Sequence, residues 1–131
     1  MLRGKNAAAT IAVKDVNAAK RFYENTLGLE LVDDSQAPEA LVYKSGISQI
    51  LVYRSQYAGT NKATAATWDV GDDIETIVQS LKTKGVAFEH YDMPEMTLKG
   101  DVHVADSMKA AWFKDPDGNI HALVSGVTAT V

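Results

Sequence analysis

Cysteine, long apolar runs and clustered positive charge are all missing from this chain, and each absence narrows its class. Among 131 residues there is no cysteine, which excludes disulfides, thiolate metal sites and a cysteine nucleophile. No segment approaches the roughly 18 uninterrupted apolar residues that a membrane span requires. We therefore expect a cytoplasmic protein with no membrane partner.

The charge balance excludes a further class of partner. The 13 Lys and Arg residues stand against 17 Asp and Glu residues, for a net charge of -4. Phosphate recognition needs a clustered positive surface, so nucleic acid is not an expected partner. Hydrophobic residues at 46% and charged residues at 23% are typical of an ordinary globular domain. The remaining candidate partners are a small-molecule ligand and a second copy of the chain.

The first half of the chain predicts one helix among several strands. Residues 8–13 form a strand pattern, and Asp15 can then cap a helix whose apolar residues recur every three or four positions until Gly28 ends it. Three further strand patterns follow, at residues 29–32, 40–43 and 49–53. The order is therefore β-α-β-β-β.

The second half predicts the same order. A strand pattern over residues 65–70 precedes a helix that Asp72 and Asp73 can cap, and Gly85 ends that helix before a strand over residues 86–91. From the capping Asp to the closing Gly, each predicted helix spans 13 positions. The halves thus form an internal repeat of about 57 residues, with a chance match as the alternative.

A hairpin over residues 110–124 completes the second half. Pro116 presets φ for the second position of a type I turn, and Gly118 supplies the positive φ that returns the chain antiparallel. We therefore expect one domain that contains two modules and a linker rich in Ser, Gly, Thr and Asn. Their predicted ranges are 1–131 for the domain, about 5–54 and 65–128 for the modules, and about 55–64 for the linker.

Two segments of the chain resemble a known family. The sequence FYENTLGL at Phe22–Leu29 and the turn DPDGN at Asp115–Asn119 resemble motifs of the glyoxalase/bleomycin-resistance/dioxygenase superfamily, also called the vicinal oxygen chelate superfamily. Residues 88–94 and 111–115 look like those of its uncharacterised bacterial members. The resemblance implies an α+β fold in which tandem βαβββ modules form a cupped mixed sheet around a ligand cleft, and it implies a homodimer.

The same resemblance permits a test for metal ligands. Metal-dependent members take His or Glu from one position in the opening strand and one in the closing strand of each module. The matching positions carry Ala8, Ile50, Ala65 or Ala66, and Ala122. None of these side chains offers nitrogen or oxygen to a metal. We therefore predict a member without the usual metal ligands and without a cofactor, which disfavours metal-dependent lyase or dioxygenase activity.

The three histidines are the remaining candidates for catalysis. His121 should point toward the helices as a half-buried core residue, rather than act as a ligand, if Ala122 points into the cup, because successive strand residues face opposite sides. His90 and His103 flank an irregular segment, and a surface loop is the simplest interpretation of both. Val102 and Val104 also place His103 on a plausible strand, where its neutral ring could act as a base.

Aromatic and methionine side chains are candidates to line the cleft. A metal-free cup that binds a planar ligand needs aromatic walls, and flexible thioethers at residues 93, 96 and 108 suit a lid. For each residue the alternative is core packing, the capping of a strand edge or a strand-ending turn. The candidate ligand-binding residues are Trp68, Trp112, Tyr43, Tyr53, Tyr91, Met93 and His103.

Three functions fit this sequence. The first is metal-independent binding of a small organic or aromatic molecule, as in the bleomycin-resistance members. The alternative is a glyoxalase-type lyase or isomerase that acts on a small carbonyl compound, and the missing ligands argue against it. The third is a non-enzymatic partner module that uses the fold for dimerisation. One fold hosts many activities, so the site must decide among them.

Overall fold

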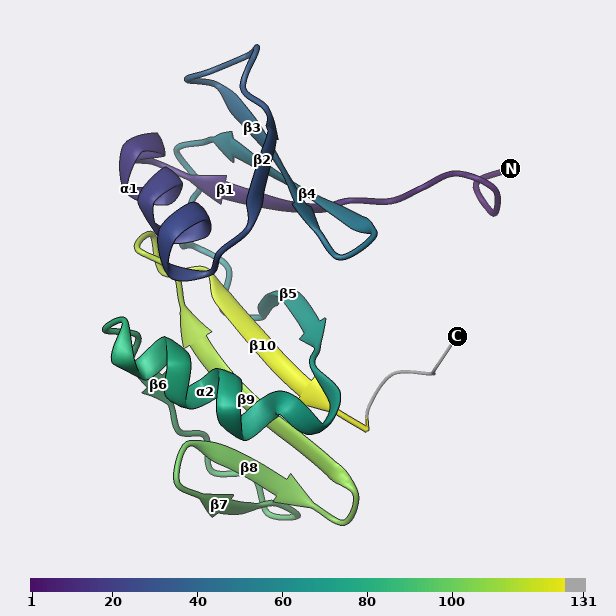
Figure 1. The fold of residues 1–131 in the computed structure, drawn as a ribbon, viewed down its shortest axis with the longest axis vertical. Coiled ribbons are helices and arrows are strands. Elements are labelled where there is room, and N and C mark those ends of the chain that lie inside the picture. The colour runs from purple at the N-terminus through teal and green to yellow at the C-terminus, as the bar shows by residue number, and fades with distance from the viewer. Residues whose placement is uncertain (127–131) are drawn as a thin grey trace. The chain divides into compact units, whose positions relative to one another are not determined.

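The computed structural model describes residues 1–126, and the predicted end of the second module near residue 128 lies outside them (Figure 1). The chain divides into two compact units. The first contains Met1–Asn61 together with Pro116–Asn119, and the second contains Lys62–Asp115 and the chain from Ile120 onward. Among the described residues, no helix is long and apolar enough to cross a membrane.

The first unit contains one helix and a four-stranded sheet. The strands lie in the order β1-β4-β3-β2, with β1 parallel to β4 and the other pairs antiparallel. The Asp15 carboxylate accepts a hydrogen bond from the Ala18 N–H at 3.1 Å and caps the helix as expected. The elements are β1 (Ala9–Val13), α1 (Val16–Lys20), its π-helical continuation η1 (Arg21–Thr26), β2 (Glu30–Asp33), β3 (Ala40–Ser45) and β4 (Ser48–Arg54).

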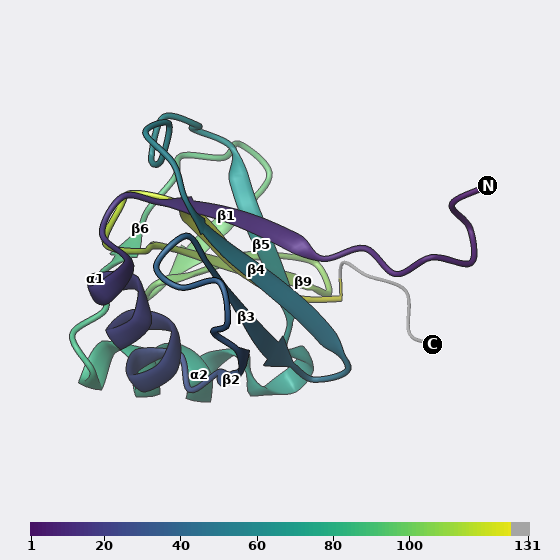
Figure 2. The same cartoon turned by 90° about the horizontal axis from the view of Figure 1, so that it is seen from above.

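The helix covers one face of this sheet (Figure 2). The ring of Tyr43 lies 6.1 Å from that of Tyr23 on η1, and Tyr43 pairs directly with Ile50. Residues directly opposite one another share a face, so Tyr43 and Ile50 both point toward the helix. This is the helix face of the first sheet. On its far face the strands present Thr10, Ala12, Gln49, Leu51 and Tyr53.

The second unit repeats this topology with an insertion. Its sheet has the order β5-β10-β9-β8-β7, and β6 pairs with β9 beyond the end of β8. The path β5-β10-β9-β6 therefore matches β1-β4-β3-β2, and the hairpin of β7 and β8 is inserted. The elements are β5 (Thr64–Asp69), the 3-10 turn η2 (Gly71–Asp73), α2 (Ile74–Thr83), β6 (Phe88–Glu89), β7 (Thr97–Lys99), β8 (Val102–Ala105), β9 (Met108–Lys114) and β10 (Ile120–Ser125).

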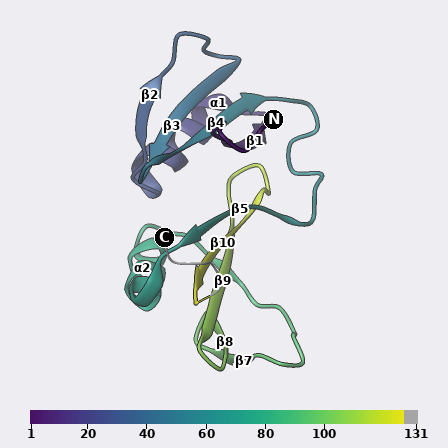
Figure 3. The same cartoon turned by 90° about the vertical axis from the view of Figure 1, so that its right-hand side faces the viewer.

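Figure 3 shows β5 at one end of the second sheet, β7 and β8 at the other, and α2 along one side. Lys109 on β9 forms an ion pair with Glu75 on α2. Strand alternation places Ala111 and Phe113 on the same side as Lys109, so these side chains define the helix face of the second sheet. The predicted α+β fold class is confirmed.

Three local expectations need correction. Strand β7 lies in the segment predicted to be irregular, and the strand expected over residues 86–91 is only Phe88–Glu89. Asp73 makes no side-chain capping hydrogen bond, because α2 begins from the turn η2. Ile50 points toward the helix, so the far-face position beside it is Gln49.

Candidate functional site

Small and aromatic side chains share the far face of the second sheet. Ala122 pairs with Trp112, Val124 pairs with Ala110, and Ala110 also pairs with His103 on β8. Strand pairing puts all five side chains on the face opposite α2. Ala110, Ala122 and Val124 form a buried cluster against which the half-buried Trp112 packs. The small alanines leave the indole as the largest group at the centre of this face.

Three rings meet at that point, and we call Tyr91, His103 and Trp112 the aromatic cluster. The Trp112 ring centroid lies 4.9 Å from that of His103 and 5.3 Å from that of Tyr91, and both contacts are edge-to-face. The Tyr91 and His103 rings are nearly parallel, 6.2 Å apart. Trp112 and Tyr91 are half-buried, whereas His103 is only 1% exposed. Trp112 and Tyr91 therefore supply the ring surface that a ligand could contact.

His103 is engaged through both ring nitrogens. Its Nε2 accepts a hydrogen bond from the Tyr91 backbone N–H at 3.0 Å, and its Nδ1 lies 3.2 Å from the Ala110 carbonyl oxygen. A carbonyl only accepts, so these partners assign the neutral tautomer with the proton on Nδ1. The ring is buried and both nitrogens face backbone groups, so this arrangement leaves no nitrogen directed at a substrate.

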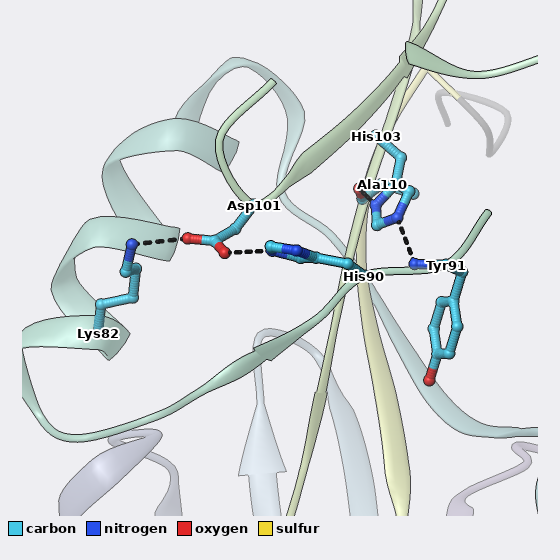
Figure 4. A network of polar contacts seen from close by, with 6 residues as sticks. All are labelled: Lys82, His90, Tyr91, Asp101, His103 and Ala110. Carbon is cyan, nitrogen blue, oxygen red and sulfur yellow. Dashed lines mark hydrogen bonds and ion pairs between the residues drawn. The ribbon is translucent and has the colours of Figure 1, made fainter. Parts of the chain in front are cut away.

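A polar network lies beside the aromatic cluster (Figure 4). The Asp101 carboxylate is 2.7 Å from the Lys82 ammonium of α2 and 2.7 Å from Nε2 of His90. The hydrogen bond from Lys82, followed by the one from His90, lowers the pKa of Asp101. His90 is exposed, as expected, and the network joins α2, the turn before β8 and the segment that follows β6.

The helix face of the second sheet holds a different aromatic group. Trp68 lies 5.3 Å edge-to-face from His121 and 6.4 Å from Phe113. His121 points toward the helix as predicted and is fully buried. Burial lowers the pKa of His121 to about 4, while the negative charge of Asp115 acts in the opposite direction. Trp68 is half-buried and packs on the helix face of the sheet, the side opposite the aromatic cluster.

The tyrosines predicted in the first unit lie on different faces. Tyr43 is fully buried on the helix face, and its hydroxyl donates a hydrogen bond to Glu24 Oε2 at 2.8 Å. Burial and the adjacent Glu24 carboxylate raise the pKa of Tyr43. Tyr53 lies on the far face and is 39% exposed. Of these two tyrosines, Tyr53 is therefore the one that a ligand could contact.

The methionines predicted over the cleft do not form one lid. Met93 lies two residues after Tyr91 and is half-buried, and its carbonyl accepts a hydrogen bond from the Met96 N–H at 3.0 Å. Met108, by contrast, begins strand β9 and pairs with Ala105. Met93 and Met96 share a turn between β6 and β7, whereas Met108 is part of the sheet.

The sequence as a whole matches a known family. The family model of the Glyoxalase/Bleomycin resistance protein/Dioxygenase superfamily covers residues 6–123. The chain belongs to this superfamily. The comparison with curated proteins gave no match.

Solved structures of other members share its fold. A glyoxalase family protein from Enterococcus faecalis is 21% identical with a TM-score of 0.71, and the match covers 95% of this chain and 100% of that one. The fosfomycin resistance protein FosX from Listeria monocytogenes is 16% identical with a TM-score of 0.72, covering 97% and 96% of the two chains. Lactoylglutathione lyase from Agrobacterium tumefaciens is 17% identical with a TM-score of 0.68, covering 94% of each.

The donor set of this superfamily member does not fit a metal ion. Strand alternation places Ala8, Gln49 and Ala122 on the far faces, where metal-dependent members carry ligands, and the matching residue of β5, Ala65, lies at a break in the register between β5 and β10. Gln49 alone among them has a side-chain oxygen, and divalent ions need about three protein ligands. Across residues 1–126, no three His, Asp or Glu side chains gather closely enough to hold an ion.

Sequence reasoning named all three members of the aromatic cluster but missed what holds them. Trp112, Tyr91 and His103 were candidate ligand-binding residues, and the structure brings these three together. Trp68 and Tyr43 were candidates too, and each lies on the helix face of its own sheet. The contacts of His103 with the Tyr91 N–H and of His90 with Asp101 were not predicted. No spacing motif in the sequence predicts these two contacts. The contact of His103 uses a backbone group, and the contact of His90 depends on the turn before β8.

Proposed function

We propose that this superfamily member binds a small aromatic or other planar organic molecule on the aromatic cluster, without a metal ion. The observation that carries the proposal is the far face of the second sheet, where half-buried Trp112 and Tyr91 rings stand beside Ala110 and Ala122. A planar ligand can stack on such rings, and each aromatic contact is worth roughly 0.5–1.5 kcal/mol beyond the area it buries. The alanines provide space rather than competing polar groups.

A lyase or isomerase of the glyoxalase type is the alternative. One structural neighbour, lactoylglutathione lyase from Agrobacterium tumefaciens, supports this alternative. The residues Ala8, Ala65 and Ala122 supply no ligand and no acid or base. Turnover of a hemithioacetal by the purified protein, lost on treatment with a chelator, would establish this alternative instead.

The two tryptophans permit a direct test of ligand binding. In a Trp68→Phe variant the only indole is Trp112, and in a Trp112→Phe variant it is Trp68. We expect planar compounds, with bleomycin and 2-naphthoate as first probes, to change the fluorescence of Trp68→Phe in the presence of EDTA. Trp112→Phe should show no change at the same concentrations, because its indole lies on the helix face.

Equilibrium dialysis of the unmodified protein provides the affinity. Replacing Trp112 with Ala should raise the dissociation constant about tenfold, which corresponds to the loss of one aromatic contact. The absence of binding across a broad panel of planar compounds would overturn the proposal, and so would equal responses from the two single-tryptophan variants.

The oligomeric state and location belong to the same proposal. We propose a homodimer in the cytoplasm, on the basis of the superfamily and the absence of cysteine from the sequence. Light scattering of the purified protein tests the first statement, and a mass corresponding to the monomer over a wide concentration range would contradict it.

A further inference from the structure

We propose that His103 is a positioning residue for the aromatic cluster: its neutral imidazole fastens the backbone of Tyr91 and so fixes the Tyr91 ring beside Trp112. The inference rests on the proposed function, because it assigns a role within the same site. His103 touches no ligand in this account. Its effect passes through Tyr91, one of the two rings that a planar molecule would contact.

Tyr91 is held by a side chain and not by pairing with a strand. Strand β6 ends at Glu89 and β7 begins at Thr97, so Tyr91 lies between strands. Its backbone N–H donates to Nε2 of His103 at 3.0 Å rather than to a neighbouring strand. The imidazole therefore does for Tyr91 what a carbonyl oxygen does inside a ladder.

The two ring nitrogens of His103 form a bridge between two backbone groups. His103 accepts from Tyr91 at one nitrogen and faces the Ala110 carbonyl at the other, 3.2 Å away. One rigid ring thus links the loop after β6 to strand β9. Phenylalanine would fill the space and remove both bonds. Glutamine would retain an acceptor at about the position of Nε2, because its amide oxygen extends as far from the backbone as that nitrogen.

The inserted hairpin anchors two consecutive residues. His90 is held by Asp101 in the turn before β8, and Tyr91 is held by His103 on β8 itself. In Figure 4 the His90 side chain points toward Asp101 and the Tyr91 side chain points away from it. Fastening both residues leaves Tyr91 little freedom to rotate away from Trp112. The hairpin of β7 and β8 is thus the support of the aromatic cluster.

The experiment first examines the protein without any ligand. Nitrogen-15 spectra of the imidazoles should show His103 as the neutral tautomer with its proton on Nδ1. Amide hydrogen exchange of Tyr91 should accelerate at least about tenfold in His103→Phe, as expected for the loss of a buried hydrogen bond, and should stay within about threefold of the parent in His103→Gln. A proton on Nε2, or unchanged exchange in His103→Phe, would overturn the inference.

A matched control uses the other buried histidine of this sheet. His121 is 0% exposed and lies on the helix face. His121→Phe should leave both the exchange of Tyr91 and the binding of 2-naphthoate unchanged. Equal effects from His121→Phe and His103→Phe would mean that any buried histidine has this influence, which would contradict a specific role for His103.

Binding then separates this inference from the proposed function. The affinity for 2-naphthoate should fall about tenfold in His103→Phe and largely recover in His103→Gln. If Tyr91 exchanges faster but the affinity is unchanged, the positioning role fails while the proposed function survives. If the parent protein binds no probe, the proposed function fails, and the exchange and tautomer data still decide what His103 holds. Should His103→Phe not fold, the tautomer and His103→Gln remain decisive.

Discussion

The two units share a strand order and differ in what their far faces carry. Both place their first strand beside their last, and both pack one helix against a single face. The far face of the first sheet holds Thr10, Gln49 and Tyr53, whereas that of the second holds the aromatic cluster. The duplicated topology therefore supplies a frame, and one inserted hairpin supports the candidate site through His103.

The units also differ in which of them contains the histidines and in which of them contains the turn between β9 and β10, which we call the shared turn. All three histidines lie within the second unit, so any loss of stability that comes from histidine protonation should originate there. Residues Pro116–Asn119 connect β9 to β10 but cluster with the first unit.

The largest effect is expected where the shared turn meets the first unit. A Cβ at Gly59 would lie 2.0 Å from the carbonyl oxygen of Asp117, and φ at Gly59 is +74°. Gly59→Ala should lower the free energy of unfolding by about 4 kcal/mol, because backbone must shift. Gly28 has the same φ of +74° with no atom near its Cβ position, so Gly28→Ala should cost only about 1 kcal/mol. Urea unfolding curves measure both, and equal losses would contradict this account.

The second prediction concerns acid and the buried His121. Above pH 6.5 this histidine is neutral in both states, but between pH 6.5 and about 4 the unfolded chain takes up a proton that the folded chain does not. Stability should therefore fall as the pH drops through this interval, by about 3 kcal/mol. His121→Phe should flatten that part of the profile. Chemical denaturation at a series of pH values tests this, and an unchanged slope in the variant would refute it.

The third prediction compares two tyrosines of the first unit. Tyr43→Phe removes a hydrogen bond to the Glu24 carboxylate and should cost about 1.5 kcal/mol. Tyr53→Phe, on the far face, should change stability by less than about 0.5 kcal/mol. Because the pKa of Tyr43 is raised, ultraviolet titration should find its phenol still protonated in alkaline solutions that ionise a free tyrosine side chain. Ionisation of Tyr43 at the pH typical of free tyrosine would contradict its burial beside Glu24.

The smallest effect compares the starts of the two helices. Asp15 caps α1 through its carboxylate, so Asp15→Ala should cost about 1 kcal/mol. Asp73 makes no such hydrogen bond, and Asp73→Ala should cost only about 0.3 kcal/mol through the helix dipole. Thermal unfolding followed by circular dichroism resolves this difference. A larger loss at Asp73 would show that the 3-10 turn depends on its carboxylate.

Much of the fold could be predicted because its signals are local. Asp15, Gly28 and Gly85 mark helix ends in the sequence, and both glycines adopt the positive φ that such ends favour. Strand β7 could not be predicted, because Pro94 and Gly100 interrupt the pattern and its pairing within residues 1–126 is with β8 alone. Ile50 was assigned to the wrong face because a shift of one residue reverses a strand, and its register is set by pairing with β1 and β3 rather than by the local sequence.

The candidate site was predictable in composition but not in arrangement. The reading of Ala122 as a cup position placed His121 toward the helix, and period-two alternation suffices for that. The role of His103 depends on a backbone N–H twelve residues away in sequence, which no residue pattern records. Trp68 and Trp112 are both half-buried tryptophans on strands, and only the strand register places the first on the helix face and the second on the far face.

The shared turn also has a consequence for synthesis of the chain on the ribosome. Asn119 donates to the Ala12 carbonyl at 2.7 Å, and Asp117 accepts from the Lys14 N–H at 3.1 Å. These partners of the opening strand follow it by more than 100 residues in the sequence, so they are translated well after it. The first unit therefore cannot complete its contacts when its own opening segment has emerged, and it must wait until the hairpin of β9 and β10 leaves the exit tunnel.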